Sequence, residues 1–185
     1  MPEGMSNGRN ARLTSHPAPA GLNSLWCWRQ WVPLRRIIRN FCVGYTCRYL
    51  PSLRWKNRLY RLIGVKIGER AAPGLAVTLD IFFPQLIEIG ENSIIGYNTV
   101  ILAHEFLIEE LRTGPVRIGR DVMIGANVTI LAGVEIGDGA TISACSLVNS
   151  DVPAGAVYGG VPARPLTRDE GTTPKELDFS EDERR

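Results

Sequence analysis

A period of six residues constrains the fold of this chain more than any other feature of its sequence. Aliphatic or aromatic residues recur at this interval in two runs, which are Val77, Phe83, Ile89, Ile95 and Ile101, and then Ile118, Ile124, Ile130, Ile136, Ile142 and Val148. Amphipathic helices repeat at three and four residues, and half-buried strands repeat at two. Sandwich strands recur at a looser spacing of about 8–12 residues. The period therefore predicts a mainly β protein, a parallel β-helix in which each six-residue unit forms one short side.

The residues between these anchors agree with this interpretation. A second small or apolar residue stands four places after each anchor, as at Ser93 and Thr99, and a glycine often follows the anchor, as at Gly90 and Gly96. Three sides make one coil, so the eleven anchors correspond to about four coils.

The period is interrupted once. Ile118 follows Ile101 by 17 residues, which is not a multiple of six. We expect residues 105–117 to leave the column as a loop, and insertions in repeat scaffolds commonly carry the binding function. His104 stands where the regular coil ends and this loop begins. An imidazole at that place is a candidate proton acceptor.

The remaining sequence divides into three parts. Residues 1–24 are rich in Gly, Pro, Asn and Ser and are expected to be disordered. Residues 25–64 have apolar residues at helical spacing among arginines and predict a basic amphipathic helical segment. The β-helix domain is expected over 65–166, followed by an acidic disordered tail over 167–185.

The charge of the chain is unevenly distributed. Its formal net charge is only +2, yet no Asp or Glu occurs between Gly4 and Gly68. The basic helical segment also holds all four tryptophans, Trp26, Trp28, Trp31 and Trp55. Two interpretations stay open and are compatible: the segment covers the open first coil of the β-helix, or it rests on an anionic membrane surface.

Other sequence features limit the expected location of the protein and its expected partners. The sequence has no apolar run long enough for a spanning helix and no apolar core of a signal peptide near its start, so we expect a cytoplasmic protein, peripheral to the inner membrane face if the segment docks there. Cys27, Cys42, Cys47 and Cys145 lack metal-ligand spacing. None of the recognised nucleic-acid-binding motifs is present, so no nucleic-acid partner is expected.

Several motifs, read in order, resemble one known family. Besides the repeat, they are Ile101–Phe106 with His104, then Gly114–Gly119, Val122–Asn127 and Gly159–Arg164. In this order they resemble the hexapeptide-repeat acyltransferases, nearest the galactoside, maltose and xenobiotic (chloramphenicol) O-acetyltransferases. The resemblance covers about Gly64 to Leu166. It implies a left-handed β-helix and a homotrimer with active sites in the grooves between neighbouring copies. This handedness is an exception to the usual right-handed crossover.

The resemblance also implies an activity and its residues. His104 would take the proton of an acceptor hydroxyl, whose oxygen then attacks the thioester of acetyl-CoA, and no metal is expected. The implied cofactor-binding residues are Ala126, through its backbone N–H, Ala144 along the pantetheine arm, Asn149 and Ser150 along the cofactor, and Arg164 near the phosphates. Relatives often have Thr-Lys at the Asn149–Ser150 pair, so this chain has one cation fewer there.

Three further residues are assigned from the same comparison of patterns. Asp80, from the first regular coil, is expected to bind acceptor hydroxyls, and Glu105 to orient the acceptor. Cys145 stands where relatives commonly have glycine, which would strain the backbone if the position needs a positive φ. A nucleophilic role for this thiol is disfavoured because no second histidine is near in sequence.

The acceptor and two alternative functions remain open at this point. The leading prediction is acetyl-CoA-dependent O-acetylation of a sugar or similar small acceptor. The alternatives are a membrane-surface acyltransferase of glycan or lipid assembly and a non-catalytic hexapeptide module for assembly or binding. A carbonic anhydrase on the same kind of column needs three histidines for zinc, and this chain has two histidines in total.

Overall fold

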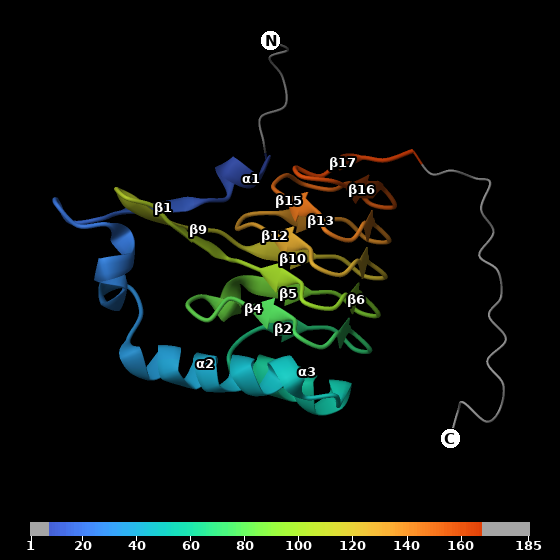
Figure 1. Ribbon diagram of the computed structural model, residues 1–185, viewed down its shortest axis with the longest axis horizontal. Helices are drawn as coiled ribbons and strands as arrows, with labels where there is room; N and C mark the ends of the chain where they lie inside the picture. Colours follow the sequence, from blue (N-terminus) through green and yellow to red (C-terminus); the bar gives the residue numbers. More distant parts are fainter. Residues whose placement is uncertain (1–7, 168–185) are drawn as a thin grey trace, which may run out of the picture.

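Three parallel sheets form the walls of a column in the computed structural model, which describes residues 8–167 (Figure 1). The first wall contains β2 (Lys66–Ile67), β5 (Ile87–Ile89), β10 (Val116–Ile118) and β13 (Glu135–Ile136). The second contains β3 (Ala72–Pro73), β6 (Ile94–Ile95), β11 (Met123–Ile124), β14 (Thr141–Ile142) and β16 (Val157–Gly159), with β17 (Arg164–Pro165) antiparallel at its end. The third contains β4 (Thr78–Leu79), β7 (Val100–Ile101), β12 (Thr129–Ile130) and β15 (Leu147–Val148). Because consecutive strands pass from wall to wall, the chain winds as a parallel β-helix.

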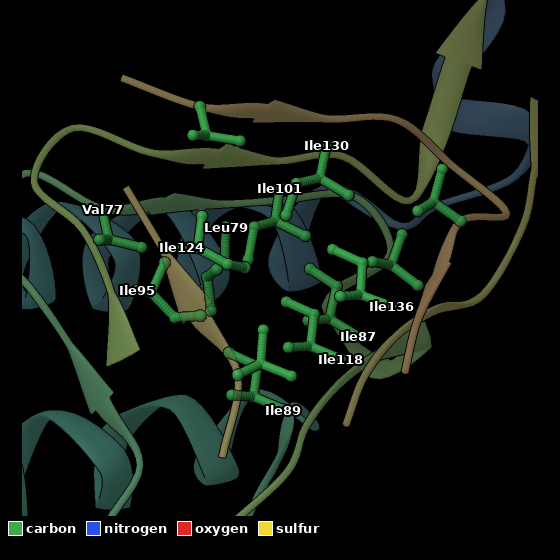
Figure 2. Close-up of a cluster of buried hydrophobic side chains, with 14 of the residues drawn as sticks. Val77, Leu79, Ile87, Ile89, Ile95, Ile101, Ile118, Ile124, Ile130 and Ile136 are labelled. Carbon is green, nitrogen blue, oxygen red and sulfur yellow. The ribbon is translucent and has the colours of Figure 1, made fainter. Parts of the chain in front are cut away.

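The core lies inside the column and consists of stacked aliphatic side chains (Figure 2). Ile89, Ile95 and Ile101 pair in register with Ile118, Ile124 and Ile130 of the next coil. The same ladder continues upward through Ile136, Ile142 and Val148. Each of these side chains is almost fully buried, and burial of one such side chain contributes roughly 1.5–3 kcal/mol. The six-residue period is thus the period of inward-facing side chains.

The first coil differs in phase from the prediction. Its anchors are Ile67, Pro73 and Leu79, which pair with Ile89, Ile95 and Ile101. Val77 is buried in the core as expected, but it is level with Thr99 and so takes the second inward position, and the assignment of Val77 and Phe83 as anchors is wrong. Phe83 instead precedes η2 (Pro84–Leu86), a 3-10 turn between the third and first walls. Because of the extra residues of that turn, more than six positions separate Leu79 from Ile89. The sequence pattern alone does not show where these extra residues lie.

The corners of the column explain the glycines and the left-handed residues. Between the second and third walls, Asn98, Asn127 and Cys145 have φ values of 54°, 56° and 58°. The Asn98 side-chain amide donates to the Asn127 side-chain oxygen at 2.9 Å, so successive corners are bonded to each other. A Cβ on Gly96 would lie 2.4 Å from the Gly125 carbonyl carbon, which excludes larger residues there. Cys145 therefore occupies a left-handed position that side-chain-bearing residues adopt infrequently.

A helical layer covers the end of the column beside the first coil (Figure 1). It comprises α2 (Leu34–Tyr49) and α3 (Leu53–Leu62). The preceding η1 (Ser24–Gln30) lies beside the insertion, where the Ser24 hydroxyl donates to the Leu107 carbonyl at 2.6 Å. The Asn57 amide donates to the Ala71 carbonyl at 2.8 Å, and the Lys56 ammonium donates to the carbonyls of Pro73 at 3.1 Å and Gly74 at 2.8 Å. Burial lowers the pKa of Lys56. The layer therefore satisfies carbonyl groups of the first coil, as the covering interpretation requires. None of the helices within residues 8–167 is long and apolar enough to cross a membrane.

The insertion leaves the column as an antiparallel hairpin of β8 (His104–Phe106) and β9 (Glu110–Thr113). The N-terminal strand β1 (Thr14–Pro17), preceded by α1 (Gly8–Ala11), pairs with β9 as a third strand. The prediction of a disordered segment over 1–24 is thus wrong for residues 8–24. Two guanidinium groups hold this segment, because Arg9 Nε donates to the Ala132 carbonyl at 2.6 Å and Arg12 Nε to the Gly133 carbonyl at 2.9 Å. The expectations for residues 1–7 and 168–185 lie outside the described part.

Candidate active site

His104 and Asp80 come together at one corner of the column. Asp80 follows β4, and His104 follows β7, the neighbouring strand of the third wall. One Asp80 carboxylate oxygen accepts the backbone N–H of Phe82 at 2.7 Å and of Phe83 at 2.9 Å. The other oxygen accepts the Ala103 N–H at 2.8 Å and contacts Nδ1 of His104. The carboxylate is fully buried, so the column holds it in one orientation.

This arrangement determines which nitrogen of His104 can accept a proton. Because the Asp80 oxygen accepts hydrogen bonds, His104 Nδ1 carries the hydrogen and donates it. The lone pair then lies on Nε2, for which residues 8–167 supply no hydrogen-bond partner. An imidazole in this tautomer, fixed by a buried carboxylate, is arranged as a general base.

Aromatic rings enclose the imidazole on several sides. The ring centroids of Phe106, Phe82 and Phe83 lie 4.7, 5.0 and 5.9 Å from that of His104. Only 14% of the His104 side chain is exposed. This exposed part faces a cavity of about 290 Å³ between α2 and the third wall. The base is therefore shielded from most water yet open to a bound molecule.

Two predicted acceptor-binding residues have other partners in the structure. The prediction that Asp80 binds acceptor hydroxyls is contradicted, because both of its oxygens are used internally and its side chain has no exposed surface. The Glu105 carboxylate forms an ion pair with Arg9, and both side chains are largely buried. Arg9 was missed because nothing in its sequence surroundings indicates a contact 96 positions away. The contact between Asp80 and His104 can be inferred once the coils are aligned in register, because this alignment places both residues at one corner of the column.

The predicted cofactor residues lie at two different corners. Ala126 and Ala144 are stacked between the second and third walls, where a Cβ on the adjacent Gly125 would lie 2.5 Å from the Ala144 nitrogen. Asn149 and Ser150 follow β15 at the corner that also holds His104, on later coils. Arg164, in β17, is exposed, and its guanidinium donates to the Ala163 carbonyl at 2.8 Å. The third wall separates Ala126 and Ala144 from His104, so a single copy does not unite them.

Among residues 8–167, no three His, Cys, Asp or Glu side chains lie together as a metal-binding group.

Comparison with known proteins identifies the family. The model "Bacterial transferase hexapeptide (six repeats)" matches residues 115–150. "Putative acetyltransferase YvoF" of Bacillus subtilis (strain 168) is 52% identical over 154 residues, which are 83% of this chain and 90% of that protein. "Putative acetyltransferase SAS0727" of Staphylococcus aureus (strain MSSA476) is 42% identical over 139 residues, covering 74% of this chain and 86% of that protein.

Solved structures share the fold at lower identity. The hexapeptide-repeat acetyltransferase VCA0836 from Vibrio cholerae O1 biovar eltor, complexed with acetyl coenzyme A, superposes with a TM-score of 0.60 at 23% identity over 78% of this chain and 88% of its own. A galactoside acetyltransferase in complex with coenzyme A gives a TM-score of 0.57 at 22% identity over 97% and 99%. These matches confirm the resemblance that the motifs indicated. The chain therefore belongs to the hexapeptide-repeat family of bacterial acetyltransferases.

Proposed function

We propose that this chain is an acetyl-CoA-dependent O-acetyltransferase that acts on a hydroxyl of a sugar or similar small acceptor, with His104 as the general base. The observation that carries the proposal is the Asp80–His104 pair, in which Asp80 bonds Nδ1 of a histidine that lines a cavity. Relatives named as acetyltransferases, and a fold shared with proteins that were solved with acetyl-CoA or CoA, support the donor.

The reaction follows from this geometry. His104 Nε2 removes the acceptor hydroxyl proton as the oxygen forms a bond to the thioester carbonyl carbon. The tetrahedral oxyanion needs a hydrogen-bond donor, and the backbone N–H of Ala126 is the proposed one. When the intermediate collapses, the carbon–sulfur bond breaks and the CoA thiolate takes the proton from the imidazolium. The products are an acetyl ester and free CoA. Asp80 orients the base and stabilises its charged form.

The proposed active unit is a homotrimer of left-handed β-helices. Its support is the separation of the site residues: Ala126 and Ala144 lie at one corner of a copy and His104 at another. A groove between two copies would bring one copy's His104 beside the partner's alanine corner. Asn149, Ser150 and Arg164 are proposed to line the same acetyl-CoA path.

Product analysis tests the activity directly. The full chain is incubated with acetyl-CoA and a panel of sugars and other alcohols, while thiol release is followed and products are examined by mass spectrometry. We expect release that depends on a hydroxyl acceptor, with a product that gains one acetyl group and loses it to hydroxylamine at alkaline pH, which cleaves oxygen esters and leaves amides intact. Acetylation of amines only, or no acceptor-dependent release with any alcohol, would contradict the proposal.

A membrane-surface version of this activity is a second candidate, because of the side chains that residues 22–62 expose. Within residues 8–167, 11 of the 19 exposed large hydrophobic side chains belong to residues 22–62, including Trp26 at 78% exposure. Arg29, Arg35, Arg36 and Arg39 are exposed on the same segment, which contains no acidic residue. Aromatic side chains beside arginines suit the interface of an anionic bilayer.

Vesicle binding of charge variants tests this docking. We expect the full chain to sediment with phosphatidylglycerol vesicles at low salt and not to sediment with phosphatidylcholine vesicles. Replacing Arg35 and Arg36 with alanine should weaken binding by a factor of order 10–30, since each basic residue near the surface contributes about 1 kcal/mol. The matched control replaces Arg117 and Arg120, two exposed arginines on the side of the column, and should bind normally. Equal affinity for both vesicle types would rule out docking.

A further inference from the structure

The cavity beside His104 is apolar on the sides that this chain supplies. Helix α2 contributes Phe41 and Tyr45, and the opposite side is formed by Leu79, Ile81, Phe82 and Leu102. Phe41 and Tyr45 stack on each other at 6.1 Å between centroids, yet they are 56% and 62% exposed. Exposed aromatic rings that border a cavity gain stability when an apolar group covers them.

Several polar groups of the same cavity are already bonded within the chain. Arg48 donates to the Thr78 hydroxyl at 3.0 Å and to the Asn98 side-chain oxygen at 3.4 Å. The Asp80 carboxylate is fully used by backbone N–H groups and His104. A polyol bound here would lose its hydrogen bonds to water and find few acceptors in return, which costs free energy. His104, the exposed Tyr45 hydroxyl and the remaining N–H groups of Arg48 are the polar groups left for the acceptor, and one hydroxyl suffices to meet them.

We propose that the acceptor hydroxyl is attached to an apolar or aromatic group, and that the cavity between α2 and the third wall binds this group. The inference rests on the proposed function and narrows its acceptor class, for example to glycosides or alcohols with an apolar substituent. The apolar group lies against Phe41, Tyr45 and Ile81, and its hydroxyl reaches Nε2 of His104.

Gly44 provides a sharp test because it leaves room in this cavity. It lies in the middle of α2, and the nearest atom to a Cβ added there is Ile81 Cγ2 at 4.0 Å. Gly44→Leu therefore places a side chain into the cavity without a backbone clash, and leucine is a better helix former than glycine. Thr46→Leu adds the same side chain to an exposed position of the same helix and serves as the matched control.

Binding is measured first, without acetyl-CoA. Dissociation constants of 1-butanol, 1-pentanol and 1-hexanol are determined by ligand-observed NMR with the full chain, with glycerol as the polar comparison. Affinity is expected to rise about fourfold per added methylene group, as burial of one CH₂ predicts. Gly44→Leu should weaken 1-hexanol binding at least tenfold, whereas Thr46→Leu should leave it unchanged. No chain-length dependence, or equal binding in Gly44→Leu, overturns the inference.

Turnover then separates this inference from the proposed function. We expect a phenyl galactoside to exceed the matching methyl galactoside in kcat/KM by a factor of order ten or more, with the preference lost in Gly44→Leu. If transfer occurs but methyl galactoside is equal or better, the acceptor class is wrong and the acetyltransferase assignment survives. If neither glycoside nor any alkanol is acetylated while 1-hexanol still binds in the cavity, the proposed function fails and the apolar site stands.

Discussion

Replacement of His104 by alanine is expected to lower kcat for acetyl transfer by a factor of order 10²–10⁴. The variant removes the nitrogen that accepts the hydroxyl proton, while the acetyl-CoA path proposed along Ala126, Ala144 and Arg164 stays intact. KM for acetyl-CoA should therefore change little. Steady-state thiol release with saturating acceptor measures the effect, and circular dichroism with a melting curve checks that the column remains folded.

The second histidine of the chain supplies the control for this experiment. His16 lies in β1, which pairs with β9 of the insertion, and its Nε2 is 3.3 Å from the Thr113 hydroxyl. His16→Ala removes the same side chain from a position that is not among the residues lining the His104 cavity, and its kcat should equal that of the native chain. Unchanged turnover in His104→Ala would show that another group takes the proton. Equal losses in both variants would indicate damage to the β1–β9–β8 sheet instead of lost base catalysis.

The sequence predicts the column well because its period has a single physical cause. Each anchor from Ile89 onward faces inward, so substitution by polar residues is excluded at every sixth position. The loop after His104 is also visible, since it breaks this period. The phase of the first coil is not visible, because η2 inserts residues at a corner without altering the hydrophobicity of Val77 or Phe83. The period of apolar residues shows which side chains are buried. A corner of different length does not change the burial of the neighbouring residues, so the period does not show it.

From the sequence, a site residue can be predicted only where its own residue type and position indicate a chemical role. His104 is conspicuous because histidine is rare in this chain and stands at the break in the repeat. The sequence does not reveal the partners of Asp80, since its four hydrogen bonds depend on chain positions that only the folded corner brings together. Arg9 gave no signal, because a breaker-rich composition describes low burial and says nothing of strand pairing or of guanidinium bonds to a distant corner.

Asp80→Asn is the second variant with a large expected effect, and it tests Asp80 as a positioning residue. An asparagine side chain has one oxygen and one NH₂ group in place of the two carboxylate oxygens. Its NH₂ group must therefore face either the backbone N–H groups of Phe82 and Phe83, or the Ala103 N–H and the His104 imidazole. In either orientation, buried donors lose their acceptor, and the free energy of unfolding should fall by about 1–3 kcal/mol. His104 also loses the partner that fixes its tautomer, so kcat should fall by a factor of order 10²–10⁴.

A double-mutant comparison distinguishes positioning from general damage. If Asp80 acts through His104, then Asp80→Asn should lower kcat strongly in the native chain and have almost no further effect on the residual rate of His104→Ala. The loss of stability should persist in both backgrounds, because the backbone N–H groups lose their acceptor regardless of residue 104. Asp138→Asn is the matched control: Asp138 accepts the Arg120 N–H at 2.8 Å at another corner, which lowers its pKa, and it is exposed. Its replacement should leave turnover unchanged. A further large loss of residual rate on adding Asp80→Asn to His104→Ala would mean that Asp80 serves the reaction by a route other than the imidazole.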